Sequence, residues 1–210
     1  MSDSPATPPG PPSRGRYAKG VERRREILDR AIEVFAERGA ERTSLRAIGE
    51  AIGVSHAALR HYFSSREELL VAVYAAAERR CAEEDPTPEE ESAVGEMRRA
   101  ARRNRGVPGL VQLYSALVAG ALEEGHEESR DFFAGRFASL REALAQRVRR
   151  EQRAGRVRAD IDPRAAAALV IAASDGLQIQ WLLDPEIDME ESLRLLERFL
   201  GPDGDAAGGG

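Results

Sequence analysis

The chain has 210 residues, 42% of them hydrophobic, and its 31 basic and 36 acidic side chains give a formal net charge of −5. The apolar fraction is too large for a wholly disordered chain, and the sequence contains no run of about 18 uninterrupted apolar residues, which argues against a membrane-spanning helix. The first residues lack the apolar segment of a secretory signal, and the single cysteine, Cys81, cannot form an internal disulfide, so we expect a cytoplasmic protein.

The composition favours helices, and the charge is unevenly distributed. The chain contains 34 Ala and only three Thr, and 30 of its 31 basic residues are Arg; Ala and Arg are both strong helix formers. Residues 1–65 hold 11 basic and 8 acidic residues, a net charge of +3, whereas the remainder holds 20 and 28, a net charge of −8. These counts predict an all-α protein with a small basic N-terminal unit and a larger acidic body.

Both ends of the chain lack apolar periodicity. Residues 1–19 are rich in Pro, Gly and Ser and are predicted to form a disordered arm, and residues 202–210 a disordered tail. Between them, apolar residues at helical spacing predict a first helix over about 21–38, with Gly39 as its C-cap. The apolar face of this helix consists of Ile27, Leu28, Ala31, Ile32 and Phe35.

The next two predicted helices form a helix-turn-helix. Thr43 or Ser44 can cap a short helix that ends at Gly53, and Ser55 can cap another that runs to about His61. The buried seam between them is predicted to comprise Leu45, Ile48, Ile52, Val54 and Leu59, and small Ala47 lets the helices approach closely. The second helix of such a pair can lie in a DNA major groove, but two short helices joined by a Gly turn also occur in ordinary bundles.

Six more helices are predicted after this pair. Ser64 and Glu67 form a capping box that opens a helix from about Ser65 to Ala82. Asp162-Pro163 opens another that ends at Leu183. The remaining helices are predicted at about 89–104, 109–123, 127–154 and 189–200, which gives nine helices and no strand.

The stretch from Ile27 to Tyr74 resembles the DNA-binding domain of the TetR family of transcriptional regulators. The matching residues are Ile27-Leu28, Ala31, Phe35, Gly39, Thr43-Ser44-Leu45, Ile48, Ile52-Gly53-Val54-Ser55, Leu59, His61-Tyr62-Phe63 and Arg66-Glu67-Glu68-Leu69-Leu70. The resemblance implies a nine-helix TetR-like architecture, with a helix-turn-helix DNA-binding domain at 20–65 and a helical effector-binding and dimerisation domain at 66–201. It also implies a ligand-responsive repressor, acting as a homodimer on a pseudo-palindromic DNA operator in response to an unknown small-molecule effector.

The same resemblance indicates which residues contact DNA. Thr43 can reach a phosphate, Ser55 and His56 begin the recognition helix, and Tyr62 matches an aromatic that usually contacts the backbone. Arg66 stands where the family most often has Lys, whereas Arg60 departs from the family, which commonly has Tyr there. An Arg can bind guanine O6 and N7 bidentately, so Arg60 reads a base or holds a phosphate. The predicted DNA-binding residues are Thr43, Ser44, Ser55, His56, Ala57, Arg60, His61, Tyr62 and Arg66.

The N-terminal unit contains two further groups of polar residues. The role of the basic residues before the first helix stays open, and a metal site at the two histidines is disfavoured. Arg14, Arg16 and Lys19 precede the first helix and form either a minor-groove arm or a solvated tail. His56 and His61 lie five residues apart, on different faces of a helix, and no carboxylate or thiol joins them. We therefore predict no metal site and no cofactor.

The acidic body carries most of the scarce aromatic residues with a few polar groups among them, which is the usual composition of a small-molecule pocket, and the resemblance implies that an inducer binds there. Ordinary core packing explains the same residues. The predicted ligand-binding residues are Met97, Leu113, Tyr114, Leu117, Phe133, Phe137, Ile171, Asp175 and Gln178. Small and apolar residues on the last two helices suit a four-helix interface between two copies, or packing within one chain. The predicted interface residues are Leu169, Ala172, Ala173, Gly176, Leu177, Leu193, Leu196 and Leu200.

Two alternative classes of function remain at this point. A helical scaffold protein that never binds DNA would show the same helical periodicity. An enzyme would need catalytic groups, but the sequence has no His/Asp/Ser or paired-carboxylate cluster at persuasive spacing, so we predict no catalytic residue.

Overall fold

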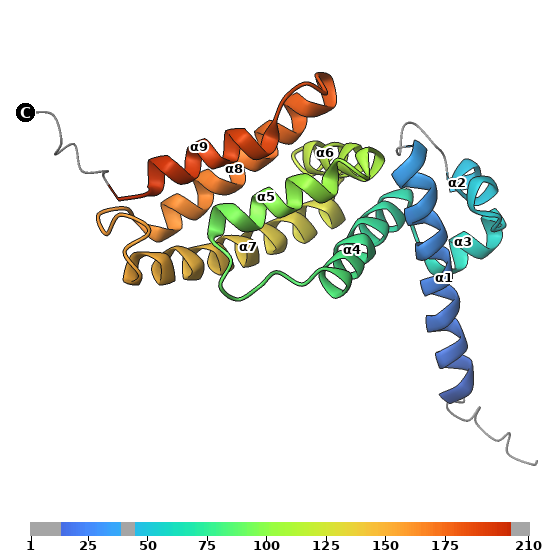
Figure 1. Ribbon diagram of the computed structural model, residues 1–210. Helices are drawn as coiled ribbons and strands as arrows, with labels where there is room; N and C mark the ends of the chain where they lie inside the picture. Colours follow the sequence, from blue (N-terminus) through green and yellow to red (C-terminus); the bar gives the residue numbers. More distant parts are fainter. Residues whose placement is uncertain (1–13, 39–44, 203–210) are drawn as a thin grey trace, which may run out of the picture.

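In residues 14–38 and 45–202, the parts that the computed structural model describes, the chain forms nine α-helices and no strand (Figure 1). The helices are α1 (Arg14–Arg38), α2 (Leu45–Ile52), α3 (His56–Tyr62), α4 (Arg66–Glu84), α5 (Ala93–Asn104), α6 (Pro108–Gly120), α7 (Glu127–Arg153), α8 (Pro163–Leu183) and α9 (Met189–Leu200). The predicted all-α class is therefore confirmed, and the predicted bounds of α8 and α9 agree with the structure.

Helix α1 begins earlier than the sequence pattern predicts. It starts at Arg14, not near residue 21, so residues 14–19 are helical and the predicted disorder of the whole 1–19 segment is wrong for this part. The prolines end at Pro12, and the following Arg, Ala and Lys residues are good helix formers even without an apolar stripe. Residues 1–13 and 203–210, and with them the rest of both predicted tails, lie outside the described residues.

The cap of α4 is shifted by one residue from the prediction. Ser65, not Ser64, is the N-cap, and its Oγ accepts a hydrogen bond of 2.9 Å from the Glu68 amide. The Glu68 carboxylate in turn accepts from the Ser64 amide at 2.6 Å. Because the helix begins at Arg66, its third residue is Glu68, and Glu67 is left to bind another helix.

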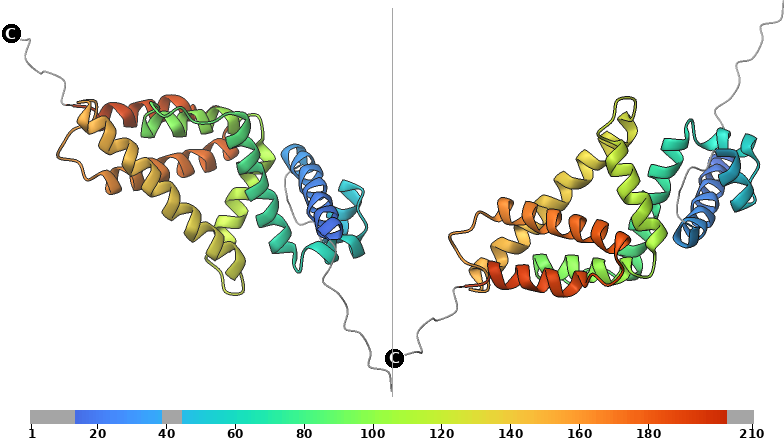
Figure 2. Two further views of the ribbon diagram at one scale, coloured as in Figure 1. Left: turned by 90° about the horizontal axis from the view of Figure 1, so that it is seen from below. Right: turned by 90° about the horizontal axis from the view of Figure 1, so that it is seen from above.

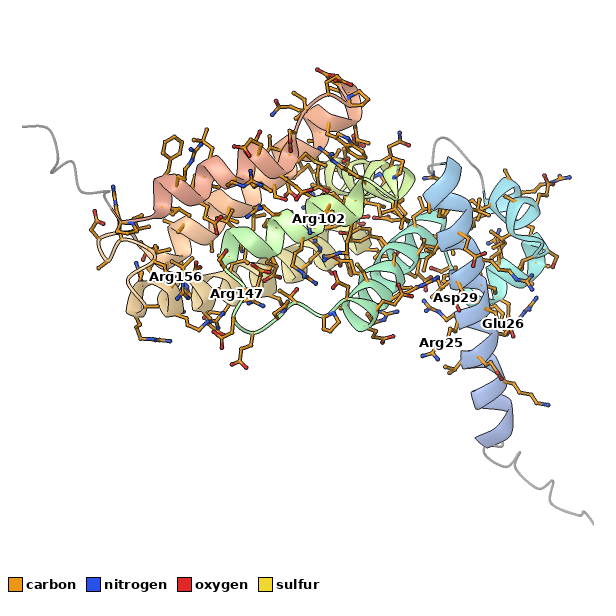
Figure 3. The ribbon with its side chains drawn as sticks, in the orientation of Figure 1. Arg25, Glu26, Asp29, Arg102, Arg147 and Arg156 are labelled. Carbon is orange, nitrogen blue, oxygen red and sulfur yellow. The ribbon has the colours of Figure 1, made fainter. Side chains whose placement is uncertain are left out.

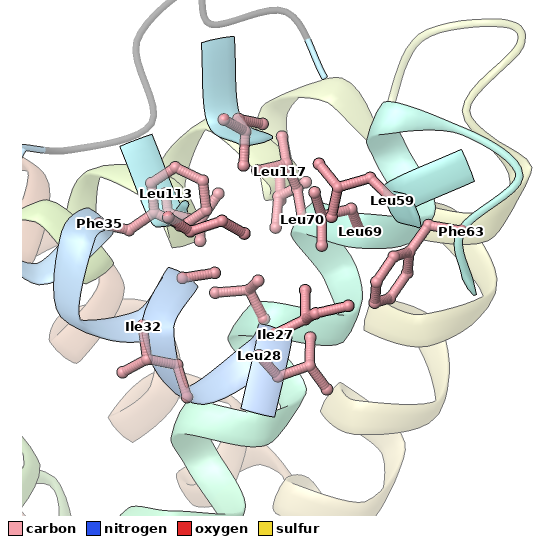
Figure 4. Packing of buried hydrophobic residues seen from close by; sticks show 14 of the residues in the cluster. Ile27, Leu28, Ile32, Phe35, Leu59, Phe63, Leu69, Leu70, Leu113 and Leu117 are labelled. Atoms are coloured by element: carbon pink, nitrogen blue, oxygen red, sulfur yellow. The ribbon is translucent and has the colours of Figure 1, made fainter. Parts of the chain in front are cut away.

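The buried residues form two clusters, and α4 lies between α1 and the helices of the body (Figures 1 and 2). The first cluster lies inside the N-terminal unit and includes the buried faces of α1 to α4 together with Leu113 and Leu117 of α6 and Phe133 of α7 (Figure 4). The second lies among α5, α7, α8 and α9. Since α6 and α7 supply side chains to the first cluster, the N-terminal unit is packed directly against the body.

Arginine side chains join the helices of the body (Figure 3). Arg147 of α7 donates to the carbonyl oxygens of Pro88, Glu89 and Glu91 at 3.0, 3.2 and 2.9 Å, which holds the segment between α4 and α5. Arg102 of α5 donates to Glu190 of α9 at 2.6 Å. These contacts fix the segment between α4 and α5 to α7, and they fix α5 to α9.

Helix α8 is the one helix, within the described residues, that is long and apolar enough to cross a membrane by length and composition. Its best 18-residue window has a mean hydropathy of 1.4, and 39% of that window is buried inside the protein. Core helices of soluble proteins pass the same test, and α8 packs against α5, α7 and α9. This single helix is weak evidence for a membrane span.

The contact between α2 and α3 allows a test of the fold. A Cβ added at Gly49 would lie 2.5 Å from the Val54 carbonyl oxygen and 3.2 Å from Leu59 Cδ1. Because the first of these is backbone, we expect Gly49→Ala to lower the free energy of unfolding by about 1–3 kcal/mol in urea denaturation. Gly135→Ala is the control: a Cβ there meets nothing within 4 Å, and the free energy of unfolding should rise by about 0.5–1 kcal/mol. If both substitutions changed the free energy of unfolding equally, the close approach of α2 and α3 at Gly49 would be contradicted.

Candidate nucleic-acid interface and internal cavity

The turn between α2 and α3 depends on two glycines. Gly53 has a φ of +68°, the left-handed conformation that glycine adopts without strain. The Val54 amide donates to the Gly49 carbonyl at 2.8 Å, and Gly49 has no room for a side chain. The structure thus confirms Gly53 as the turn residue, and places the closest approach at Gly49, where the sequence prediction put it near Ala47.

Helix α3 is anchored by one face and presents the other to solvent. The predicted seam is confirmed, with Ile48, Ile52, Val54 and Leu59 buried and Leu45 half-buried. The predicted cap is also found, since Ser55 Oγ accepts from the Ala58 amide at 3.2 Å. The opposite face of α3 can therefore enter a groove while the seam keeps its orientation.

Most predicted DNA-binding residues lie on this outward face. His56, Ala57, Arg60 and His61 are exposed, as are Ser55 before the helix and Arg66 at the start of α4. Tyr62 is half-buried, and its ring meets that of His61 edge-on at 4.9 Å. Thr43 and Ser44 lie outside the described residues. The described residues of this set thus extend from the cap of α3 to the first residue of α4, and all but Tyr62 are exposed.

Two arginines of α1 contact the ends of α2 and α3. Arg30 donates to the Ile52 carbonyl at 3.5 Å, at the end of α2, and the Arg24 guanidinium lies 4.8 Å from the centre of the Phe63 ring. Sequence reasoning assigned neither residue a role, because nothing local distinguishes a surface arginine from one that reaches a neighbouring helix.

The first turn of α4 is bound to the start of α7. Glu67 Oε1 accepts from the Ser129 amide at 2.9 Å, and Glu67 Oε2 lies 3.4 Å from His126 Nδ1. Burial acts to raise the pKa of Glu67, but the hydrogen bonds from Ser129 and the nearby His126 outweigh it, so the pKa is lowered. The Ser65 hydroxyl also donates to Glu128 at 3.2 Å. These contacts fix the start of α4 against the start of α7.

A cavity of about 380 Å³ lies among α4, α5, α6, α7 and α8. Apolar side chains such as Val111, Leu140 and Ile171 form much of its wall, and polar groups enter from every helix. Its volume falls in the range of about 300–1,000 Å³ typical of small-molecule pockets. The polar lining residues are Tyr74, Glu78, Asp85, Thr87, Glu96, Arg103, Asn104, Tyr114, Arg136, Ser174, Asp175 and Gln178.

Five of the nine predicted ligand-binding residues line this cavity: Met97, Tyr114, Ile171, Asp175 and Gln178. Leu113, Leu117 and Phe133 do not, because they are buried in the cluster of the N-terminal unit. Phe137 packs against both buried clusters and is likewise not part of the lining. Leu113 and Tyr114 are both buried in the first cluster, but successive residues of a helix are rotated by about 100°, and only Tyr114 also lines the cavity.

Sequence reasoning missed the polar network that crosses the cavity. Arg136 of α7 donates to Glu78 of α4 at 2.7 Å, and the Tyr74 hydroxyl donates to Glu78 at 3.1 Å. Burial raises the pKa of Tyr74 and of Tyr114 above the usual range, so both phenols stay protonated. The spacing of Tyr74 and Glu78 on α4 is the available sequence signal, but their partner lies 58 residues downstream of Glu78.

The outer face of α8 carries an exposed apolar stripe. Leu169, Ala172, Gly176, Ile179 and Leu183 follow one another at steps of three and four residues, and Leu169 and Leu183 are 60% and 83% exposed. Leu195 and Phe199 of α9 are also exposed.

The other predicted interface residues do not form this surface. Leu193 and Leu200 are buried in the core of their own protomer, so their prediction as surface contacts is wrong. Ala173, Leu177 and Leu196 are half-buried against the same core. Helix α9 is rotated so that Leu195 and Phe199 point outward in place of Leu193 and Leu200.

The chain matches known transcriptional regulators along most of its length. The family model of bacterial regulatory proteins of the tetR family matches residues 27–73, and that of the C-terminal part of BetI-type transcriptional repressors matches residues 116–201. The HTH-type transcriptional repressor Rv1474c of Mycobacterium tuberculosis is 31% identical over 155 residues, which cover 74% of this chain and 80% of that protein.

A second repressor and a solved structure of the same family are also similar to this chain. The HTH-type transcriptional repressor KstR2 of Rhodococcus jostii is 45% identical over 47 residues, 22% of this chain and 23% of that protein. The crystal structure of a TetR-family regulator from Rhodococcus sp. is 25% identical and covers 85% of this chain and 98% of that one, with a TM-score of 0.67. With its helix-turn-helix, its nine helices and these relatives, the chain belongs to the TetR family of bacterial transcriptional regulators.

Proposed function

We propose that this DNA-binding repressor acts in the cytoplasm as a homodimer on a pseudo-palindromic operator and releases it when a small molecule occupies the internal cavity. The observation that carries the proposal is that one helix, α4, lines the cavity at Tyr74 and Glu78 and begins directly after the DNA-facing surface. The experiment that tests it is to select the protein's binding sites from genomic DNA and measure affinity for them. A protein that binds no DNA at low salt would contradict the proposal.

The exposed face of α3 supports contact with the major groove. Arg60 is exposed, whereas the adjacent Leu59 is buried, and an exposed arginine of this helix can bind guanine bidentately or hold a phosphate. Ser55, His56, Ala57, His61 and Tyr62 surround it, and Thr43, Ser44 and Arg66 complete the proposed contact set. The net charge of +3 of residues 1–65 favours this surface for DNA, while the charge of −8 of the body disfavours other orientations.

The stripe on α8 supports dimerisation. Apolar residues at alternating steps of three and four residues form a seam that a second helix can pack against, and Ala172 and Gly176 allow close approach. A two-fold dimer presents two α3 helices to successive turns of the major groove, which matches a pseudo-palindromic site. Leu195 and Phe199 of α9 extend the proposed interface.

Occupancy of the cavity supplies the proposed signal. A ligand that moves Tyr74 or Glu78 moves α4, and the bonds of Glu67 and Ser65 to α7 resist any independent motion of its first turn. A coupling free energy of about 1–3 kcal/mol changes operator affinity by roughly 5–150-fold, which is enough to control a promoter.

One prediction concerns the contact of Arg66 with DNA. We expect Arg66→Ala to weaken binding to specific and unrelated DNA alike and to reduce the slope of log affinity against log salt by about one for each protomer, and so by about two for the dimer, because each protomer loses one phosphate contact. Fluorescence anisotropy at several salt concentrations measures both effects. Arg194→Ala removes the same charge from exposed α9 and should leave the slope unchanged. An unaltered slope in the Arg66 variant would remove this residue from the phosphate contacts.

Another prediction concerns the exposed apolar stripe of α8. Ile179 is 52% exposed in the protomer, so Ile179→Glu should fold, but it places a charge in the proposed interface. We expect the dimer dissociation constant to rise by roughly tenfold or more in sedimentation equilibrium, because an unpaired buried charge is costly. Leu122→Glu, at an equally apolar but remote exposed position after α6, is the matched control. Equal dimerisation of the two variants would place the interface elsewhere.

A further inference from the structure

We propose that the cavity binds an organic amine in its protonated form, with an N–H group of the ammonium donating to the Asp175 carboxylate and an apolar group held by α5 to α8. The inference rests on the proposed function, since it names the ligand class of the same cavity. Its evidence is the set of carboxylates and arginines that line the cavity, together with the ion pairs that most of them already form.

Three of the four carboxylates that line the cavity already have an arginine partner. The pairs are Glu78 with Arg136 at 2.7 Å, Asp85 with Arg103 at 3.1 Å, and Glu96 with Arg147 at 2.7 Å. The fourth carboxylate, Asp175, forms no ion pair with any residue of the described parts of the chain. An added cation in this cavity therefore has one carboxylate whose charge is not yet paired.

The partners of Asp175 are neutral and converge on a single oxygen. Asp175 Oδ1 accepts from the Tyr114 hydroxyl at 3.0 Å and from Gln178 Nε2 at 3.4 Å. Asn104 Nδ2 donates to Gln178 Oε1 at 2.7 Å, which fixes the orientation of that amide. The carboxyl group is thus oriented by its neighbours, with Oδ2 left to accept from a ligand.

Burial makes a cation the favourable partner for this group. Burial raises the pKa of Asp175, and the hydrogen bond from Tyr114 and the charge of Arg136 only partly oppose this effect. A carboxylate in such surroundings gains more from a charged donor than an exposed one does, because water does not screen the pair.

An anionic ligand fits these groups less well. The two cations of the lining, Arg103 and Arg136, are engaged with Asp85 and Glu78. Arg136 also lies over the rings of Tyr74 and Tyr114, with its guanidinium carbon 5.7 and 5.2 Å from their centres. An anion would have to compete with Glu78 for Arg136 or with Asp85 for Arg103, whereas a cation at Asp175 displaces no ion pair.

The rest of the ligand is apolar and small. Met97, Val111, Leu140 and Ile171 supply apolar wall, and a volume of about 380 Å³ lies at the lower end of the range for ligand pockets. Because a carboxylate oxygen accepts hydrogen bonds, the geometry favours an ammonium that carries N–H groups over a quaternary one.

Three probes of one shape test the ligand class: 4-phenylbutylamine, 4-phenylbutanol and 4-phenylbutyrate, titrated into the full-length protein by calorimetry at neutral pH. We expect the amine to bind roughly tenfold or more tightly than the alcohol or the acid, since a charge-assisted hydrogen bond is gained. Binding of the alcohol or the acid as tightly as the amine, or no binding of any of the three, would overturn the inference.

Two variants locate the interaction. Asp175→Asn keeps the shape of the side chain and should lower affinity for the amine by roughly tenfold while leaving that for the alcohol unchanged. Asp131→Asn removes the same charge from an exposed position of α7 and should change neither. Unchanged amine affinity in the Asp175 variant would overturn the assignment. The comparison of probes on the unaltered protein decides the ligand class even where the variant does not fold.

Operator binding, measured separately without any probe, distinguishes this inference from the proposed function. A protein that binds its DNA site but prefers the alcohol or the acid would contradict the ligand class alone. A protein that prefers the amine but binds no DNA would contradict the repressor function and leave the ligand class standing.

Discussion

Helix α4 has to satisfy two environments at once, and the rest of the molecule is arranged around this constraint. Its buried face, with Leu69, Leu70 and Val73, completes the core of the N-terminal unit. One and two turns beyond Leu70, Tyr74 and Glu78 line the cavity. A closely packed core transmits small displacements because it has little free volume to absorb them. The same helix can therefore report on the cavity and set the position of the helix-turn-helix.

The charges of the body show how a polar cavity is kept compatible with folding. A buried charge is costly unless it is paired, and Arg136, Arg103 and Arg147 each pair with a carboxylate of another segment. These pairs join α4, α5 and α7 around the cavity. Asp175, held only by neutral donors, is the exception, and exceptions of this kind are expected at functional sites rather than in ordinary core.

The total net charge does not indicate the function, because the two parts of the chain carry opposite net charges. The total of −5 suggests a protein that avoids nucleic acid, yet residues 1–65 are net basic and contain the exposed face of α3. The remaining excess of acidic residues lies in the body, where it disfavours nonspecific contact with DNA. Charge acts over roughly a Debye length of 8–10 Å, so its local distribution decides which surface meets a phosphate backbone.

The sequence by itself determined the helices, most of their ends and the helix-turn-helix, because caps, breakers and apolar periodicity act over a few residues. The seam from Ile48 to Leu59 and the cap at Ser55 followed from such local patterns. Only the tertiary structure decided that Leu113 packs into the core while Tyr114 lines the cavity, and that Phe199 faces outward while Leu193 is buried. Both depend on how each helix is rotated against its neighbours, as does the bond between Arg136 and Glu78. That rotation is set by packing between segments far apart in the chain, which a local pattern does not encode.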